Sequence, residues 1–562
     1  MNEFLTQIIN EISERIGYGN DLRIIVSNRP ELCDYQCDDA FRLAKEYKKS
    51  PMVIGNDIVE EINKREDFKE IFNEVTFVNP GFINMSVSNK LINKFIRKMN
   101  DEEKFGIKQE KAKTFVIDYG GPNVAKPLHV GHVRTAIVGE SIKRIIKYVG
   151  HNTIGDVHLG DYGLQIGQVI YGLEKEGIAK ENITIQSLEE IYPKMSALCK
   201  DDEDVKEKCA SITKKLQDGD TEYRGIFEVI LETSKKDIKR LYDYLNVSFD
   251  YWYGESDAYN YVETVEKLLS PYIKMSEGAE IIDVFDENGK ELAPLIFKKS
   301  NGAYLYGTTD LATIYQRMED FNPDNILYVV DNRQSLHFKQ VFSVAKSSDL
   351  SKDTKLEFLG YGTVNGTDGK PFKTRSGDTP KLDDLFKQIK EIFINKREEN
   401  KNLDEDDLDI LVNSILKFAD LQNTRDKDYI FDISKFGDVA GKTGPYILYT
   451  YLRNEKIMKN EVIKNELSDT IYSESDKNLR LKLLDLESAI RNAFEERKPH
   501  YIADYIYNLA VLSNTFYQYN HINGLEDIIK KDSLIYIMNL TNRVIKELLE
   551  LIMIDIPKTM WK

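Results

Sequence analysis

Cysteine is scarce in this chain of 562 residues, which has only Cys33, Cys37, Cys199 and Cys209. Neither neighbouring pair has zinc-finger spacing, and so few thiols in this length are ordinary for a reducing cytoplasm. We therefore expect all four cysteines to be structural, and we predict no metal site.

Long apolar runs are also missing. The most apolar late segment, residues 548–556, is interrupted by Glu550 and Asp555 and is far shorter than the roughly 20 residues of a transmembrane helix. The first four residues already include an acidic one and do not resemble a signal peptide. The sequence therefore predicts a cytoplasmic protein that binds no membrane.

Positive charge is in deficit, with 77 basic against 94 acidic residues and a net charge of −17. Nucleic-acid binding depends on contacts from Lys and Arg to phosphates, so this balance argues against a non-specific binder. A local basic face can still lie on an acidic protein, so composition neither predicts nor excludes an RNA partner. The length predicts three or four globular domains.

Residues 118–132, which read DYGGPNVAKPLHVGH, are the most informative part of the chain. Residues 114–119 have the β-branched and aromatic content of a buried strand, and glycines and prolines then form a tight loop. From Gly131 to Val149 the apolar residues recur every three or four positions, which predicts a helix with one buried face. His129 and His132 therefore lie at the start of this helix.

A helix start suits a phosphate, because it offers unpaired N–H groups and the positive end of the helix dipole. His129 and His132 share one face of the first turn and can donate hydrogen bonds to an α-phosphate as pyrophosphate leaves. Gly131 lets a nucleotide approach the backbone closely. Taken alone, a His-x-x-His pair fits equally well half of a metal site or two surface residues.

A second strand is predicted at residues 152–157, followed by a loop with His158, Asp161 and Gln165 and then by another helix. A third, strongly apolar strand is predicted at residues 326–331. Alternation of strands and helices indicates a doubly wound parallel sheet, in which ligands bind at the carboxyl ends of the strands. We therefore expect these polar loops to lie at a site.

The residues around the tetrapeptide HVGH at positions 129–132 resemble a known motif. They are similar to the "HIGH" segment of class I aminoacyl-tRNA synthetases, specifically that of arginyl-tRNA synthetases, at Pro122, Asn123, residues 125–127, residues 129–132 and Arg134. Other segments resemble the N-terminal extra domain of bacterial members (residues 34–37 and 79–84) and their anticodon-binding domain (residues 444–453, 499–505 and 556–560). The resemblance covers nearly the whole chain in the family's order.

The resemblance implies an α/β fold class, with a doubly wound, Rossmann-like catalytic domain between an N-terminal α+β domain and a C-terminal all-α helical bundle. We expect a tRNA-contacting domain at residues 1–108. A catalytic domain at residues 109–400 should contain a helical insertion at about 172–290, and an anticodon-binding domain should follow at residues 401–562.

The resemblance also implies roles for individual residues. The expected ATP-binding residues are Pro122, Asn123, His129, Gly131 and His132. The expected arginine-binding residues are Asp118, Asn123, His158, Asp161, Gln165, Tyr306, Asp310 and Gln340. The expected catalytic residues are Lys126, His129, His132, Lys370, Lys373 and Arg375.

Tyr306 and Asp310 suit arginine for a physical reason. The planar guanidinium needs a carboxylate for a paired hydrogen bond and an aromatic ring to orient it. The two residues are four apart where a helix is expected to start, so both can lie on one face. Asp310 could equally cap that helix.

The loop at residues 369–377 corresponds to the family's mobile "KMSKS" lysines but is degenerate, because Ser376 stands where the second lysine is expected. Family members with this departure carry a compensating lysine before the His tetrad, where this chain has Lys126. We therefore expect Lys126 to stabilise transition-state charge. A second departure, Gly120-Gly121 in place of a serine or alanine, could weaken one contact to the substrate.

The resemblance implies ATP-dependent attachment of L-arginine to tRNA(Arg) through an arginyl-adenylate, with Mg²⁺ carried by ATP and tRNA needed before activation. We expect a monomer that binds no DNA. Three alternatives remain open: a synthetase-like binder of tRNA or arginine without turnover, a metal hydrolase using His129, His132, His151 and His158, and a ligase for a different amino acid.

Overall fold

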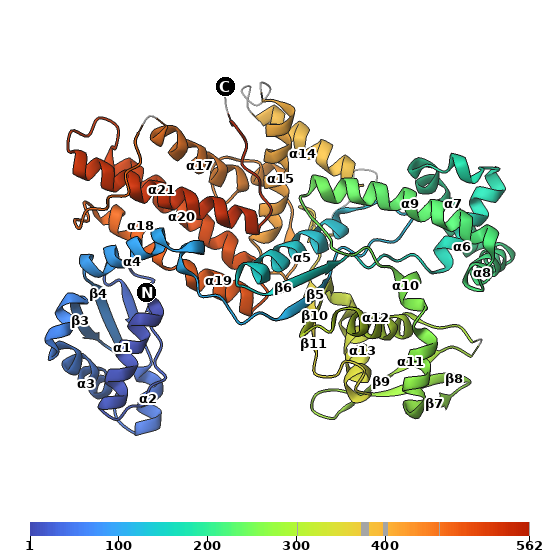
Figure 1. Cartoon of the computed structure of the whole chain (residues 1–562), viewed down its shortest axis with the longest axis horizontal. Coiled ribbons are helices and arrows are strands. Elements are labelled where there is room, and N and C mark those ends of the chain that lie inside the picture. Colours follow the sequence, from blue (N-terminus) through green and yellow to red (C-terminus); the bar gives the residue numbers. More distant parts are fainter. Residues whose placement is uncertain (301, 372–380, 397–402, 460, 561–562) are drawn as a thin grey trace. The chain divides into compact units, whose positions relative to one another are not determined.

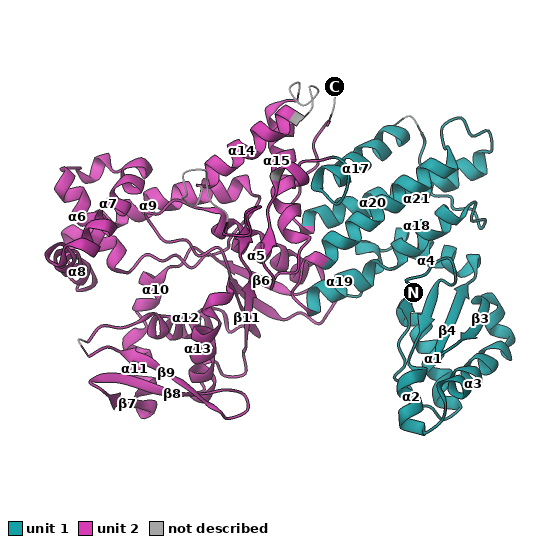
Figure 2. Cartoon of the chain, turned by 180° about the vertical axis from the view of Figure 1, so that it is seen from behind, with its two compact units in different colours: residues 1–108, 439–495, 501–550 teal, residues 109–438, 496–500, 551–562 magenta. Residues whose placement is uncertain are grey.

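The computed structural model describes residues 1–300, 302–371, 381–396, 403–459 and 461–560. The chain divides into two compact units, coloured separately in Figure 2. Unit 1 consists of residues 1–108, 439–495 and 501–550, and unit 2 of residues 109–438, 496–500 and 551–562. Within the described ranges, no helix is long and apolar enough to cross a membrane.

Unit 2 is built around a parallel sheet of four strands in the order β11-β10-β5-β6. The strands are β5 (Thr114–Asp118), β6 (Asn152–Asp156), β10 (Asn325–Asp331) and β11 (Lys355–Tyr361). Helix α5 (Val130–Tyr148) connects β5 to β6, and α13 (Ser335–Ser347) connects β10 to β11. The predicted doubly wound sheet is therefore confirmed, and so are its three predicted strands.

The strand order reverses between β5 and β10, the two central strands. Because crossovers between parallel strands are right-handed, α5 and α13 lie on opposite faces of the sheet, as Figure 1 shows. The carboxyl ends of β5 and β10 lie side by side, with Tyr328 opposite Asp118. Such a switch point is where ligands bind in open α/β sheets.

Unit 2 contains ten further α-helices in its described part. They are α6 (Leu164–Glu176), α7 (Ile185–Asp201), α8 (Glu203–Gln217), α9 (Thr221–Tyr244), α10 (Glu255–Tyr259), α11 (Val262–Leu269), α12 (Tyr306–Phe321), α14 (Leu382–Lys396), α15 (Glu405–Leu421) and α16 (Ile433–Phe436). Two short strands, β12 (Val364–Asn365) and β13 (Tyr429–Ile430), pair in parallel.

The region expected to be a helical insertion also contains a sheet. Strands β7 (Ile273–Ser276), β8 (Ala279–Phe285) and β9 (Glu291–Lys298) form a three-stranded antiparallel sheet. Glu277 and Gly278, which connect β7 to β8, both have positive φ, as a two-residue hairpin turn requires. This sheet belongs to one apolar cluster with α12 and β10, through Phe297, Leu311 and Ile326. The cluster fixes α12 relative to the carboxyl end of β10.

Unit 1 begins with a small α+β domain, as predicted. Its antiparallel sheet has the order β1-β2-β4-β3. The elements are α1 (Asn2–Arg15), β1 (Ile25–Val26), β2 (Tyr35–Cys37), α2 (Ala40–Tyr47), α3 (Pro51–Asn63), β3 (Phe72–Val78), β4 (Phe82–Val87) and α4 (Asn89–Asp101). The strand-like stretch at residues 76–85 is a hairpin that turns at Pro80-Gly81. Helices α3 and α4 were not predicted, although Ser50 and Ser88 cap their starts.

The second part of unit 1 is a helical bundle, which confirms the predicted all-α region. Its helices are α17 (Gly444–Met458), α18 (Glu474–Leu484), α19 (Leu486–Glu495), α20 (His500–Asn520) and α21 (Ile528–Leu551). The apolar pattern of the sequence predicts one helix at residues 481–494, whereas the structure has two helices, α18 and α19, that meet at Asp485.

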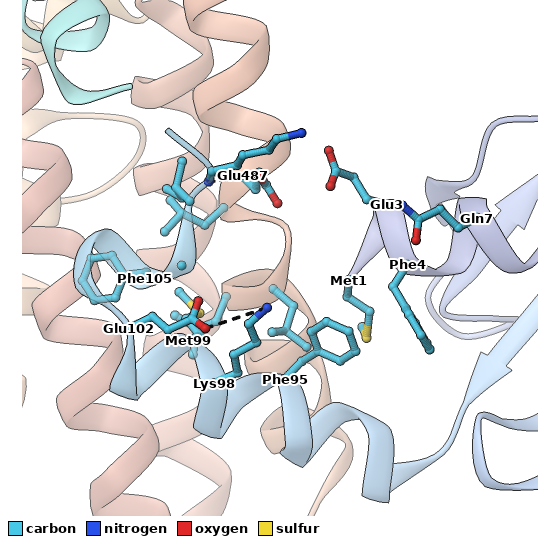
Figure 3. Close-up of a pocket in the computed structure, with 16 residues that line it drawn as sticks. Met1, Glu3, Phe4, Gln7, Phe95, Lys98, Met99, Glu102, Phe105 and Glu487 are labelled. Atoms are coloured by element: carbon cyan, nitrogen blue, oxygen red, sulfur yellow. Dashed lines mark hydrogen bonds and ion pairs between the residues drawn. The ribbon is translucent and has the colours of Figure 1, made fainter. Parts of the chain in front are cut away.

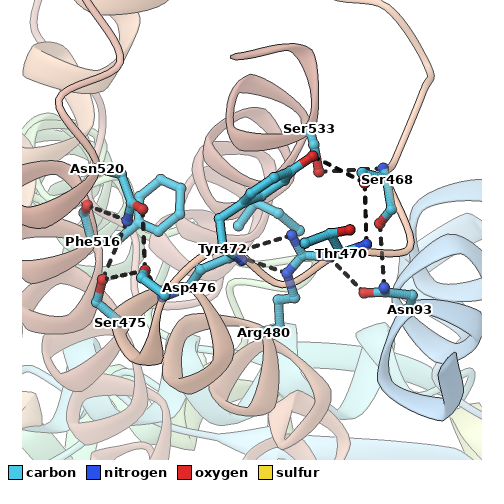
Figure 4. A network of polar contacts seen from close by, with 12 residues as sticks. Asn93, Ser468, Thr470, Tyr472, Ser475, Asp476, Arg480, Phe516, Asn520 and Ser533 are labelled. Atoms are coloured by element: carbon cyan, nitrogen blue, oxygen red, sulfur yellow. Dashed lines mark hydrogen bonds and ion pairs between the residues drawn. The ribbon is translucent and has the colours of Figure 1, made fainter. Parts of the chain in front are cut away.

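A buried polar network joins α4 to this bundle (Figure 4). Arg480 of α18 is fully buried and donates hydrogen bonds to Asp476 at 2.7 Å and to Asn93 of α4 at 2.6 Å. Asn93 in turn donates to the backbone carbonyls of Ser468 and Asp469. The N-terminal domain and the bundle are therefore held together by buried polar groups. Because water does not reach them, a lost hydrogen-bond partner would not be replaced.

A cavity of about 390 Å³ lies nearby in unit 1, between α1, α4 and the α18–α19 corner. Phe4, Phe95 and Met99 supply apolar surface, and Lys98 and Glu102 lie at its edge (Figure 3). None of the predicted site residues lines this cavity.

Candidate active site

The rings of His129 and His132 both accept hydrogen bonds from backbone N–H groups at the start of α5. His129 is the N-cap residue, and its Nδ1 atom accepts a hydrogen bond from the Gly131 N–H at 3.1 Å. The Nδ1 atom of His132 accepts from the His129 N–H, also at 3.1 Å. The ring centroids are 3.9 Å apart. The predicted placement of both imidazoles on one face of the first turn is confirmed.

This capping determines which nitrogen of each ring carries the proton. Because each Nδ1 accepts a backbone hydrogen, a neutral ring carries its proton on Nε2, which can then donate to a ligand. Burial lowers the pKa of His129, and the charge of Lys126 lowers it further. Burial, with the charges of His129 and Lys126, lowers the pKa of His132 to about 3. Both rings are therefore neutral hydrogen-bond donors and not cations at neutral pH.

Lys126 lies close enough to these rings for its charge to act on both. Its Nζ atom lies 4.6 Å from the centroid of the Tyr192 ring on α7, a cation–π contact. The ammonium group is thus held beside the start of α5.

The loop after β5 is fixed to the loop after β6 by backbone contacts. Asn123 pairs with Gly160, and the Val124 N–H donates to the Gly160 carbonyl at 3.0 Å. A Cβ atom at position 160 would lie 2.3 Å from Asn123 Oδ1, so any larger residue there would displace the Asn123 side chain. Gly120 has φ +89°, and a Cβ there would lie 2.9 Å from the Phe249 ring. The departure from the family pattern at Gly120 therefore has a local steric reason.

Tyr306 and Asp310 lie on the first turns of α12. Tyr306 is 64% exposed and, with Glu255 of α10, lines a cavity of about 770 Å³. Asp310 Oδ2 lies 2.5 Å from His337 Nε2 of α13. Burial alone would lower the pKa of His337, but this hydrogen bond and the Asp310 charge raise it. His337 thus holds the Asp310 side chain by this hydrogen bond.

Asp118 is joined to Asp156 by a residue that sequence reasoning did not predict. Arg317 of α12 donates from Nη2 to Asp118 Oδ2 and to Asp156 Oδ2, both at 2.7 Å. Arg317 and Asp156 are fully buried, and Asp118 is 7% exposed. Burial raises the pKa of Asp118, although the charges of Arg317 and His158 lower it. The carboxyl ends of β5 and β6 therefore share one buried cation.

Other predicted arginine-binding residues have partners inside the chain. Asp161 accepts hydrogen bonds from the Ser256 N–H at 2.9 Å and from the Ser256 hydroxyl at 2.6 Å. The Gln340 amide donates to the backbone carbonyls of Ala293 and Pro294 in β9. His158 has φ +41°, and its backbone N–H donates to Asp156 Oδ1. Gln165 lies in the first turn of α6.

Three family models match the chain. The model of class I (R) tRNA synthetase catalytic domains matches residues 94–433, that of the DALR anticodon-binding domain residues 447–560, and that of the arginyl-tRNA synthetase N-terminal domain residues 2–87. The arginine–tRNA ligase of Alkaliphilus oremlandii is 42% identical over 99% of both chains. That of Agathobacter rectalis is 40% identical over 99% of this chain and 100% of its own. The chain belongs to the arginyl-tRNA synthetase family.

Solved structures of the arginyl-tRNA synthetase family have the same fold. The enzyme from Plasmodium falciparum superposes with a TM-score of 0.84 at 26% identity, covering 100% of this chain and 99% of its own. The Thermus thermophilus structure has a TM-score of 0.81 at 20% identity and covers 100% of both chains, and that likeness concerns the fold alone.

One residue close to the predicted site residues was not predicted as a candidate, namely Glu255. Burial, with the charges of Asp161 and Asp310, raises the pKa of Glu255 to about 7, although His158 opposes this shift. The segment before Glu255 runs beside the loop after β6, because Tyr251 pairs with Asp156 and Gly254 with Leu159. The sequence of this segment resembles the part of the family in which the chain returns toward the active site. That resemblance gives no partner for the Glu255 carboxylate.

Only part of the predicted phosphate-binding loop at residues 369–377 lies within the described residues. Lys370 precedes Pro371, which pairs with Asn365, whereas Lys373 and Arg375 lie outside the described residues. Among the residues that the structure describes, no group of three His, Cys, Asp or Glu side chains could hold a metal ion. The four histidines of the metal-hydrolase alternative therefore form no metal site there.

Proposed function

We propose that this protein attaches L-arginine to tRNA(Arg) in an ATP-dependent reaction through an arginyl-adenylate, releasing AMP and pyrophosphate. The observation that supports this most directly is the pairing of two subsites in unit 2. Neutral imidazole donors lie at the start of α5, and Tyr306 and the Glu255 carboxylate line a cavity, with Asp310 one turn beyond Tyr306 on α12. The first subsite fits phosphate, and the second fits a guanidinium.

In the first step, the arginine carboxylate attacks the α-phosphate of ATP, a reaction governed by positioning and by stabilisation of charge. His129 and His132 donate from Nε2 to the phosphate oxygens, and Lys126 supplies a preorganised positive charge. Lys370, with Lys373 and Arg375, is proposed to contact the leaving pyrophosphate. Pro122, Asn123 and Gly131 are proposed to bind the rest of ATP.

The amino acid is proposed to lie between α12 and the ends of β5 and β6. Tyr306 and Asp310 face its guanidinium, and Glu255 adds a second carboxylate. Asp118 and Asn123 contact the amino group and backbone. The remaining arginine-binding residues form or support the walls, namely His158, Asp161, Gln165 and Gln340.

The partners and setting are part of the same proposal. We propose that Mg²⁺ arrives on ATP, since triphosphate-bound Mg²⁺ usually needs few protein ligands. We further propose that tRNA binds before activation, through a domain at residues 1–108 and an anticodon-binding domain at residues 401–562, with catalysis in residues 109–400. The protein is proposed to be a cytoplasmic monomer that binds no DNA.

The test is ATP–pyrophosphate exchange with each amino acid, with and without total tRNA. Exchange with arginine alone, and only when tRNA is present, is the expected result. Exchange with another amino acid would overturn the substrate. No exchange under any condition, with tRNA still bound, would favour a regulatory binder without turnover.

A further inference from the structure

Arg317 lies in unit 2 where α12 meets the carboxyl ends of β5 and β6. Tyr306, Asp310 and Arg317 are spaced four and seven residues apart on α12, so they share one face of the helix. The face that presents Tyr306 and Asp310 therefore carries Arg317 two turns further, beneath them, where it contacts Asp118 and Asp156.

The contacts of Arg317 are asymmetric. Both carboxylates bind the same guanidinium nitrogen, Nη2, through their Oδ2 atoms. Asp156 also uses Oδ1, which accepts from the backbone N–H groups of His158 and Tyr253. Asp118 differs, because no described residue donates to its Oδ1 atom and its side chain is the least buried of the three. Asp118 thus has one oxygen held by Arg317 and one left for a ligand.

We propose that Arg317 is a positioning residue for the α-amino group of the amino-acid substrate, because it keeps the Asp118 carboxylate ionised and oriented toward that group. This inference rests on the proposed function. Two aspartates at neighbouring strand ends repel each other when both are ionised in a buried site, and a buried cation between them removes that repulsion. Without Arg317, Asp118 would take up a proton or turn away, and an ammonium would lose its counter-charge.

The groups around this cluster are consistent with a cationic ligand. Asp310 and Glu255 are carboxylates, Tyr328 of β10 lies under the guanidinium of Arg317 at 5.4 Å, and His158 lies near Asp118 and Asp156. Arg317 is the one arginine or lysine among these neighbours, and its charge is taken up by the two aspartates. The negative charge that remains belongs to the side chains that face the substrate.

The test compares L-arginine with 5-guanidinopentanoate, which is arginine without its α-amino group. In aminoacylation by the full chain, the KM for arginine and the inhibition constant of the analogue are measured for each variant. For Arg317→Met we expect the KM for arginine to rise about 30-fold or more, because a buried charge pair has lost one partner. The inhibition constant of the analogue should change by less than about threefold. Arg317→Lys, which keeps the charge, should restore part of the preference for arginine.

Two further variants keep the test decisive. Asp118→Asn removes the substrate-facing charge but keeps the Arg317–Asp156 pair, so it should abolish the preference while the protein stays folded. Arg480→Met removes a buried, aspartate-paired arginine of unit 1 and should leave the preference unchanged. If Arg317→Met does not fold, Arg317→Gln, which can still donate a hydrogen bond but lacks the charge, decides, and an unchanged preference in that variant would overturn the inference.

The outcomes separate this inference from the proposed function. Equal weakening of arginine and the analogue in Arg317→Met would mean a purely structural role and would overturn the inference alone. A wild-type protein that charges no tRNA with arginine would overturn the proposed function instead.

Discussion

The two imidazoles at the start of α5 are neutral donors, because burial lowers the pKa of both rings. His132→Ala should therefore lower the rate of arginine-dependent ATP–pyrophosphate exchange by about 10²–10³ while arginine binding stays unchanged. Nitrogen NMR of the His132 ring should show a proton on Nε2 and none on Nδ1 from pH 5 to pH 8. A ring that gains a second proton near pH 6.5 would contradict this account.

Lys126 is predicted to act on phosphate charge and not on the amino acid. Lys126→Ala should depress exchange by about 10²-fold, since a preorganised cation gains most where charge develops in the transition state. Its effect on arginine binding should be much smaller. Lys194→Ala, on the same helix as the Tyr192 partner of Lys126, is the matched control and should change neither. Equal losses in exchange and binding would exclude the phosphate role.

Single residues could be predicted where their neighbours in the sequence define the motif. The His pair, Asn123, Tyr306 and Asp310 all lie at element boundaries that the local pattern shows. Arg317 could not be predicted, because it binds Asp118 across 199 positions and follows no local pattern. Such pairs are decided by the packing of α12 on the sheet.

At the scale of elements, α10 and α12 bring Glu255 and Tyr306 to one cavity, with Asp310 one turn further along α12, and this arrangement makes arginine binding depend on pH. The pKa of Glu255 is raised to about 7 by burial, so its carboxyl is largely protonated below that pH. Only the ionised form attracts a guanidinium, so arginine affinity should rise between pH 6 and pH 8, with release of up to about half a proton on binding at pH 7.

Titration calorimetry of arginine binding in two buffers of different ionisation enthalpy measures the number of protons released. Glu255→Gln should bind arginine more weakly at pH 8 and should lose the pH dependence over this range. Glu263→Gln, an exposed glutamate on the neighbouring helix α11, is the control. A pH dependence that survives in Glu255→Gln would assign it to another group.

Helices and strands whose apolar residues recur with a clear period were predicted better than those defined by turns and caps. The sequence predicts a helix at residues 444–458, the bounds that α17 has, although Thr450 and Asn454 lie among the residues of its buried face. Strands β7 to β9 were missed, since their alternation is partial and several of their apolar residues, such as Met275 and Ile296, are exposed. The hairpin signals at Gly278 and Gly289, both with positive φ, were the better evidence.

At the scale of the whole molecule, the division into two units differs from the order of domains along the chain. Unit 1 joins the first 108 residues to a bundle more than 300 residues later. The sequence predicted both parts but not their association, because the network that joins them has its members at positions 93, 476 and 480. Only Asp476 and Arg480 are close enough in sequence to suggest a pair.

The stability of unit 1 should therefore depend on Arg480 more than on any surface ion pair. Arg480→Met leaves Asp476 as a buried, unpaired carboxylate and removes a partner of Asn93, which typically costs about 3–5 kcal/mol. Scanning calorimetry should show unit 1 unfolding at a lower temperature, and proteolysis should release the N-terminal domain earlier. Lys90→Met breaks the exposed Lys90–Glu70 pair of the same unit and should change neither result. If the two variants unfolded alike, the buried network would not be what holds α4 to the bundle.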